Sequence, residues 1–332
     1  MFAFEYTERK LVGLHRQYSY YILLVASMVI ITGCGGGGNS STSDTPNPSD
    51  NATATVTSTP PVTPTPTVVV NTDTTPLNPL YTGKREQARL TEEATMQFIE
   101  WGDFFVSDGG YRPVPVALLY LPIVFSGTIP CFMSGEITRT SNETSLDDGG
   151  SKYVRQDIYN ACGTEIAVLN GSNTYTRINI ESPSKTITYG YNYDYTVKSA
   201  SVDYIDVYNG DTLLTKKDNN LTVKQNLYIK EENVESLKFN LQYLGTGDEQ
   251  QGVITEMTGQ TYVGDYGYVT PKVIQPLYFS GGLIFSGELI LNGANNSKAQ
   301  ILPTSTKTIV LNIDEDGDGA YEKTRNLTWS RL

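Results

Sequence analysis

The 332-residue chain is acidic, with 36 Asp and Glu against 24 Lys and Arg and a formal net charge of −12. This charge repels phosphate backbones, so we expect no nucleic-acid partner, and cations are more natural ligands than anions. The only histidine, His15, lies in a segment that we predict to be removed. Its loss excludes Ser-His-Asp and Cys-His catalysis and histidine-based zinc or haem sites.

The N-terminal segment has the order of an export signal. Three basic residues precede an apolar run, Tyr18 to Ile31, that is shorter than the roughly 20 residues a membrane-spanning helix needs. The run ends in Ile31-Thr32-Gly33-Cys34, which resembles the bacterial lipobox. We therefore predict a lipoprotein signal peptide over residues 1–33, cleavage before Cys34 and acylation of Cys34 with fatty acids such as palmitate. The alternatives are an ordinary signal peptide and a permanent membrane helix.

The predicted anchor assigns the protein to the cell envelope. Gly35 is not the aspartate that retains enterobacterial lipoproteins at the inner membrane, so we expect outer-membrane residence, with periplasmic and surface orientations both open. Residues 34–80 are predicted to be the acylated cysteine and a disordered tether rich in Gly, Thr and Pro. Residues 81–332 are long enough to form a β-rich globular domain, with a subdivision near residues 183–185 as an alternative.

Two cysteines remain after Cys34 is set aside. An even remainder in an exported protein predicts a disulfide between Cys131 and Cys162. On the chain-entropy model such a bridge stabilises the fold by about 3–4 kcal/mol. Two separate buried thiols are the alternative.

The globular part begins with a predicted helix. Thr91 offers a capping hydroxyl, Glu92 and Glu93 lie in the first turn, and apolar residues follow at helical spacing, at Ala94, Phe98, Trp101 and Phe105. We predict one helix over residues 91–106, and the glycines and prolines that follow end it.

After Cys131 the apolar period becomes two, which is typical of β-strands. Three runs show it: 187–197, Leu237-Phe239-Leu241-Tyr243, and Ile309-Leu311-Ile313. Turn-forming clusters separate them, at Asn209-Gly210-Asp211, Asp218-Asn219-Asn220, Gly245-Thr246-Gly247-Asp248 and Asn292-Gly293-Ala294-Asn295. The fold class is therefore mainly β, an antiparallel meander that forms a sandwich, a barrel or a large curved sheet.

Alternate tyrosines line one of these strands, from Tyr189 to Tyr195. Such a stripe is more often one wall of the core, with the hydroxyls reaching its edge. An exposed aromatic platform for sugars is the alternative.

The sharpest local motif is the acidic run from Asp314 to Glu322. Acids at relative positions one, three, five and nine, namely Asp314, Asp316, Asp318 and Glu322, with a glycine at position six, resemble the start of a calcium loop. Arg325 occupies position twelve and strands flank the run, so this is not an EF-hand. The alternative is a hairpin turn whose acids stay solvated.

The chain resembles a group of uncharacterised gammaproteobacterial lipoproteins. The likeness rests on the lipobox, the Cys131 to Cys162 segment, and the C-terminal pieces Ser286 to Ser297, Asp314 to Glu322 and Thr328 to Leu332. It implies residence on the cell envelope and supports the disulfide, but it implies no activity.

These features predict an envelope-anchored, non-catalytic lipoprotein with an interaction or structural role. It contacts the membrane through its lipid anchor and an envelope protein or glycan through its β domain. It requires no cofactor, and calcium is the candidate ion. Two alternatives remain, a glycan- or small-molecule-binding module and a carbohydrate-active hydrolase that uses paired carboxylates.

Overall fold

A computed structural model describes residues 77–101, 126–147, 149–163, 167–181, 185–199, 205–231, 233–247, 251–280 and 283–328. The predicted leader, Cys34, most of the predicted tether, residues 102–106 of the predicted helix and the last four residues lie outside this range. Among the described residues, no helix has both the length and the apolar character that crossing a bilayer requires.

Most of the described residues lie in β-strands, as the alternating pattern predicts. One α-helix, α2 (Glu92–Trp101), precedes the strands, and the 3-10 turns η3 (Gly264–Tyr266) and η4 (Ala294–Asn296) connect some of them. The strands are β1 (Gly127–Pro130), β2 (Ser134–Ser145), β3 (Ser151–Gly163), β4 (Ala167–Ile180), β5 (Thr186–Ser199), β6 (Ile205–Lys217), β7 (Asn220–Glu231), β8 (Val234–Gly247), β9 (Gln251–Val263), β10 (Gly267–Ser280), β11 (Leu283–Asn292), β12 (Lys298–Pro303), β13 (Thr308–Asp314) and β14 (Lys323–Thr328).

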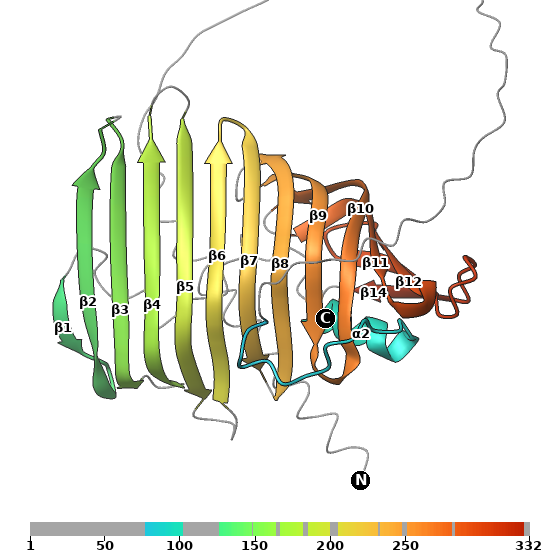
Figure 1. The fold of residues 1–332 in the computed structure, drawn as a ribbon, viewed down its shortest axis with the longest axis horizontal. Helices are drawn as coiled ribbons and strands as arrows, with labels where there is room; N and C mark the ends of the chain where they lie inside the picture. The colour runs from blue at the N-terminus through green and yellow to red at the C-terminus, as the bar shows by residue number, and fades with distance from the viewer. Residues whose placement is uncertain are drawn as a thin grey trace, which may run out of the picture. The chain divides into compact units, whose positions relative to one another are not determined.

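All of these strands belong to one sheet. Each strand pairs with the next one in the chain, so the 14-stranded order runs from β1 to β14 without a crossover (Figure 1). The pairs are antiparallel, and β1 and β14 form its two edges. Of the three arrangements that the sequence left open, the protein has the large open sheet. Strands β4 and β5, on either side of residues 183–185, pair along their length.

Helix α2 begins where its sequence predicts. The Thr91 hydroxyl accepts a hydrogen bond from the Ala94 N–H at 3.2 Å, which satisfies one of the free donors at the helix start. Phe98 is fully buried and packs in the main core beside Ile99. Burying a side chain of this size contributes about 1.5–3 kcal/mol to folding. The predicted extension of the helix beyond Trp101 lies outside the described residues.

The main core follows the apolar faces of the C-terminal strands. Ile309, Leu311 and Ile313 of β13 are buried in it, as the alternation predicts, together with residues of β6 to β12 and of α2. A second cluster, formed by β2 to β7, surrounds the Cys131–Cys162 pair.

The prediction for β8 was wrong in one respect, because its four apolar residues do not share a face. Leu237 and Phe239 pack with Tyr81, whereas Leu241 and Tyr243 pack in the main core. The switch occurs at Asn240, which has φ +49°, and the pairing of β8 with β9 shifts register at the same place. One inserted residue reverses the alternation of every side chain after it.

One predicted turn was also wrong. Asn209-Gly210-Asp211 lies inside β6 and not between strands. Gly210 has φ +128°, and a Cβ there would lie 2.0 Å from the Asn226 carbonyl oxygen of β7. The glycine therefore serves a close approach of two strands, for which only its missing side chain leaves room.

The other turn clusters lie at strand ends, as predicted. Asp218 and Asn219 connect β6 to β7, and the cluster around Gly293 connects β11 to β12 through η4. Gly245 to Gly247 end β8, and Asp248 lies outside the described residues.

The tyrosine stripe of β5 belongs to the core. Tyr193 and Tyr195 are 5% and 4% exposed, and Tyr189 and Tyr191 are half-buried against the two clusters. Tyr195 is paired with Gly171 of β4 and Tyr193 with Gly210 of β6. Large rings beside glycines cover backbone that would otherwise be exposed. The alternative of a sugar platform on this strand is therefore not supported.

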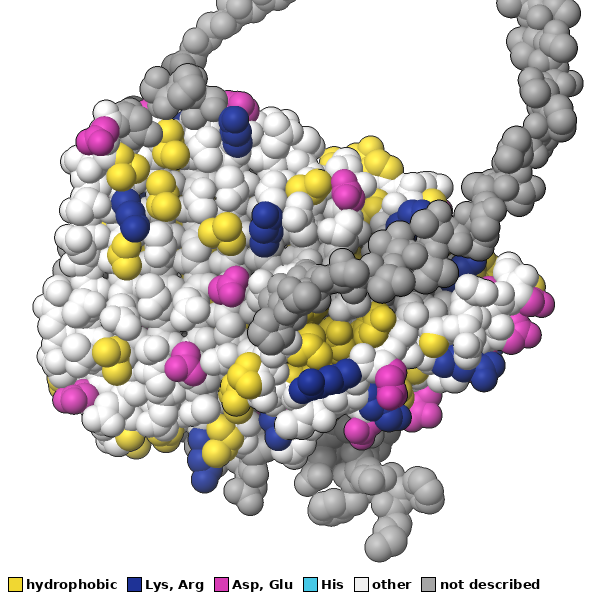
Figure 2. Space-filling model, viewed as in Figure 1, with side chains coloured by type: hydrophobic (Ala, Val, Ile, Leu, Met, Phe, Trp, Pro, Cys, Tyr) yellow, Lys and Arg dark blue, Asp and Glu magenta, His cyan; other side chains and the backbone are white. Residues whose placement is uncertain are grey.

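The segment before α2 covers a small apolar cluster on β7 to β10. Tyr81 is buried there against Tyr262, at 5.4 Å between ring centroids, and Leu77 packs against the same cluster. The Asn78 side chain donates a hydrogen bond to Asn209 of β6 at 2.8 Å. Residues 77–80, which we predicted as the end of the tether, thus contact the sheet. In Figure 2, apolar side chains gather near this segment and are scattered singly over much of the remaining face.

Candidate metal centre

The acidic run lies in the loop between β13 and β14. Asp314 is the last residue of β13 and is 1% exposed, whereas Asp316, Asp318 and Glu322 are exposed. Gly317 and Gly319 have φ +80° and +95°, which residues with a side chain rarely adopt. The glycines therefore let the loop turn tightly enough to keep all four acids on one short segment.

Hydrogen bonds from the loop backbone hold these carboxylates in place. Asp314 accepts the N–H groups of Gly317 and Gly319, at 2.7 and 3.0 Å, one on each oxygen. Asp316 accepts the N–H of Asp318 at 3.1 Å, and Asp318 accepts that of Ala320 at 2.7 Å. The loop thus folds around its own acidic side chains. Aspartates commonly accept such hydrogen bonds from nearby backbone N–H groups in tight turns.

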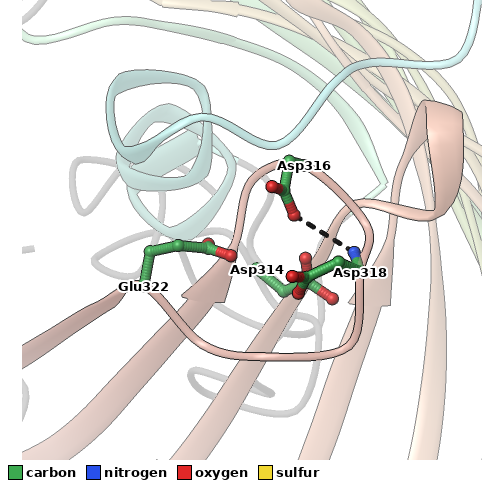
Figure 3. A group of neighbouring side chains, drawn as sticks. All are labelled: Asp314, Asp316, Asp318 and Glu322. Carbon is green, nitrogen blue, oxygen red and sulfur yellow. Dashed lines mark hydrogen bonds between the residues drawn. The ribbon is translucent and has the colours of Figure 1, made fainter.

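The structure brings the four predicted ligands together. One carboxylate oxygen from each of Asp314, Asp316, Asp318 and Glu322 lies within 4.8 Å of all the others. Figure 3 shows the side chains in the same small loop. Calcium binds oxygen at 2.3–2.6 Å, so oxygens on opposite sides of one ion lie about 5 Å apart. The spacing therefore fits a shared Ca²⁺, and hard oxygen donors without histidine or cysteine disfavour zinc.

Glu315, between the first two acids, anchors the loop to helix α2. Its carboxylate accepts the Glu92 N–H at 2.7 Å and a hydrogen bond from the Lys323 ammonium at 2.7 Å. Its carbonyl accepts a hydrogen bond from Arg89 at 3.0 Å. Arg325 in turn donates to the Glu92 carboxylate at 2.6 Å. The loop and the helix start are thus joined by alternating charges.

These contacts shift the ionisation of the residues that make them. The hydrogen bond from Lys323 is the main cause that lowers the pKa of Glu315, and the hydrogen bond from Arg325 is the main cause that lowers the pKa of Glu92. The pKa of Lys323 is raised, chiefly by its hydrogen bond to Glu315. All three groups are therefore charged at neutral pH.

The loop also packs against η4. A Cβ on Gly317 would lie 2.1 Å from the Asn295 carbonyl oxygen, so the two backbones are in direct contact. Asn295 and Asn296 both have positive φ, as asparagine tolerates. The Asn292-Gly293-Ala294-Asn295 cluster, predicted only as a turn, is therefore one wall of the acidic loop.

Sequence reasoning missed the residues that connect this loop to the helix. Arg325 entered only as the residue that rules out an EF-hand, and Glu315 and Lys323 were not selected. Arg325 and Glu92 are 233 residues apart in the chain. A Glu-rich helix start and a Lys-x-Arg pattern on an edge strand were the only signals, and many unrelated surfaces carry them.

The predicted disulfide is present in the structure. Cys131 and Cys162 are bonded, with Cα atoms 5.3 Å apart, and they join the end of β1 to the end of β3. Cys34, the predicted acylation site, lies outside the described residues.

No protein-family model matches the chain, and no curated protein and no solved structure shows significant similarity to it. The resemblance to gammaproteobacterial lipoproteins therefore stays a prediction.

Proposed function

We propose that the protein is a lipid-anchored, non-catalytic component of the bacterial cell envelope whose β domain binds one Ca²⁺ ion in the β13–β14 loop. The convergence of four carboxylate oxygens within 4.8 Å is the observation that supports the ion site most directly. The domain then has a structural or interaction role, and the ion stabilises one end of its sheet.

A bound calcium ion offsets the repulsion between the negative charges of this loop. Five acids, Asp314 to Asp316, Asp318 and Glu322, lie within nine residues, and Lys323 is bonded to Glu315 and not to the four converging side chains. Like charges this close repel each other, and a divalent cation between them turns repulsion into attraction. Calcium also tolerates irregular oxygen shells completed by water, which suits a loop with three exposed ligands.

The ion has a structural consequence beyond the loop. Glu322 accepts the Glu315 N–H at 2.8 Å, and Glu315 bonds the start of α2. An ion that holds the Glu322 carboxylate in place therefore also holds Glu315, and with it the hydrogen bond from Glu92 at the start of α2. Binding at this site should tighten the junction of β13, β14 and α2.

Isothermal titration calorimetry on the mature chain tests the ion site. We expect calcium to bind the wild-type protein and the heat to disappear in the double variant Asp316→Ala with Asp318→Ala. The matched control is Glu143→Ala with Glu256→Ala, which removes two exposed acids from β2 and β9. No heat at millimolar calcium in the wild-type protein contradicts the site.

Metabolic labelling with palmitate tests the anchor independently. Label should enter the wild-type protein and be absent from Cys34→Ala, because only the lipobox cysteine is acylated on the proposed pathway. Label that persists in Cys34→Ala contradicts the proposed anchor. Crosslinked pull-down of the native lipoprotein then tests the interaction role, through recovery of a defined envelope partner.

One observation favours a second candidate, the glycan-binding module. Tyr278 of β10 and Phe285 of β11 are 44% and 37% exposed, and their ring centroids are 6.4 Å apart. Two exposed aromatic rings next to each other form an apolar surface, which makes them a candidate binding surface. Retention of the wild-type protein on insoluble glycans, lost in Tyr278→Ala with Phe285→Ala, would support this candidate.

A further inference from the structure

The loop between β1 and β2 carries the two most exposed large apolar side chains of the described residues. Phe132 is 78% exposed and Met133 is 64% exposed, and they are adjacent at the tip of a hairpin. Large apolar groups in contact with water at a protruding tip cost free energy that a monomeric protein usually avoids. Because Phe132 and Met133 are adjacent and both exposed, the tip is a candidate binding surface.

The backbone of this tip is held rigidly. The Cys131–Cys162 disulfide ties it to the end of β3. The Cys131 N–H donates to the Gly135 carbonyl, and the Met133 N–H donates to the Gly163 carbonyl, each at 3.0 Å. A tip fixed in advance loses little conformational entropy when its side chains are buried against something else.

The tip is also free of charge, although the protein is strongly acidic. The segment from Ser126 to Gly135 contains no Asp, Glu, Lys or Arg, and neither does the end of β3 from Tyr159 to Gly163. Moving this tip into an apolar environment therefore removes no charged side chain of these two segments from water.

The position of the tip in the sheet relates it to the N-terminal segment. In an antiparallel meander, the β1–β2 and β7–β8 connections lie at the same end of the sheet (Figure 1). Leu77 packs against the small apolar cluster that includes Tyr228 and Leu237. Tyr228 lies three residues before the end of β7, and Leu237 lies three residues after the start of β8. The chain that leads back to Cys34 thus reaches the sheet at the end where Phe132 and Met133 are exposed.

We propose that Phe132 and Met133 insert into the interfacial region of the bilayer that carries the lipid anchor. The tip thus binds a phospholipid surface, and the inference rests on the proposed acylation of Cys34. The acyl chains hold the protein at the membrane, and the rigid, uncharged tip orients the sheet with its β1–β2 end toward the lipid. Apolar side chains inserted at the headgroup boundary add directly to membrane affinity.

The test uses the full mature chain with Cys34→Ser, which carries no acyl group, and vesicles of phosphatidylethanolamine with a minority of phosphatidylglycerol. In this background Phe132→Trp should shift its emission to shorter wavelength on addition of vesicles and be quenched by brominated lipids. Leu283→Trp, at the start of β11 near the opposite end of the sheet, should respond to neither.

Vesicle binding of charge-substituted variants provides the second measurement. The partition coefficient should fall at least about tenfold in Phe132→Asp with Met133→Asp. It should be unchanged in Ile274→Asp with Leu283→Asp, two exposed apolar residues of β10 and β11 that are 44% and 40% exposed. Since the four side chains are exposed, circular dichroism and mass mapping of the disulfide should show all variants folded.

Three outcomes overturn the inference. An unchanged emission of Phe132→Trp with vesicles does so directly, and so does an equal loss of binding in both double variants. Self-association that Phe132→Asp abolishes, without a response to vesicles, identifies a second copy of the chain as the occupant. Palmitate labelling of Cys34 is read separately, so failure of the tip is distinguishable from failure of the anchor.

Discussion

Arg139 of β2 and Asp157 of β3 form a bidentate ion pair inside the protein. Arg139 donates to the two carboxylate oxygens of Asp157 at 2.6 and 3.0 Å, and both side chains are no more than 3% exposed. Asp157 also lies 3.4 Å from Arg155, whose side chain is 21% exposed. The two residues lie directly opposite each other in the ladder of β2 and β3, so the ion pair forms only in this register of the two strands.

Removal of one partner of this pair should be strongly destabilising. Arg139→Met leaves a buried carboxylate without its bidentate partner, which costs about 3–5 kcal/mol in comparable sites. Urea unfolding of the full chain measures this loss of stability. Arg155→Met removes the more exposed contact with the same carboxylate and should cost less than about 1 kcal/mol. Equal losses in the two variants would contradict the importance we assign to burial.

Gly210 provides a test of the sheet geometry. Gly210→Ala places a Cβ 2.0 Å from the Asn226 carbonyl oxygen at φ +128°, so the free energy of unfolding should fall by at least about 2 kcal/mol. Gly190→Ala, on the adjacent strand β5, is the matched control. The atoms nearest to the Cβ added there would lie 3.7 Å away, which is an ordinary contact. Gly190→Ala should therefore keep the wild-type free energy of unfolding. A tolerated Gly210→Ala would show that the strands can separate there without cost.

Calcium should stabilise the folded protein if the β13–β14 site binds it. A ligand present at 100 times its dissociation constant adds about 2.7 kcal/mol to the free energy of unfolding. Calorimetric melting should therefore show a higher Tm in calcium than in chelator for the wild-type chain. Asp316→Ala with Asp318→Ala should melt at the same temperature in both, and Glu143→Ala with Glu256→Ala should keep the wild-type response.

Acid should weaken the junction between α2 and the β13–β14 loop. The pKa values of Glu92 and Glu315 are lowered from 4.5 by their hydrogen bonds to Arg325 and Lys323. A lowered folded-state pKa gives stability that is present above pH 4.5 and is lost as the pH falls through the folded-state pKa. Unfolding measured between pH 3 and pH 6 should therefore show a slope below pH 4.5.

Substitution of the basic partners tests whether the pH dependence of unfolding comes from the ion pairs of Glu92 and Glu315. The slope should be shallower in Lys323→Gln with Arg325→Gln, because those variants return both glutamates toward the ordinary pKa. Lys272→Gln, an exposed change on β10, should keep the wild-type slope. A slope that is identical in all three proteins would show that other carboxylates dominate the acid response.

The disulfide and the acidic loop could be predicted because their signals are simple. Cys131 and Cys162 are the two cysteines left after Cys34, the predicted acylation site, is set aside, so counting the cysteines was sufficient. Asp314 and Glu322 lie in one loop, and their convergence follows from the local spacing of acids and glycines. By contrast, Arg139 and Asp157 are 18 residues apart and Glu92 and Arg325 are 233 apart. Such pairs depend on strand register and on where the helix packs, which local spacing does not encode.

By itself, the sequence determined the mainly β class, the helix start at Thr91, the cysteine pair and the four acids of one loop. Each is a local property of spacing, capping or composition. Only the tertiary structure decided that the strands form one open sheet, that Asn240 turns Leu241 to the other face and that Gly210 lies inside a strand. It also decided that Phe132 and Met133 remain exposed. These features depend on contacts between strands, which form only when the whole chain has folded.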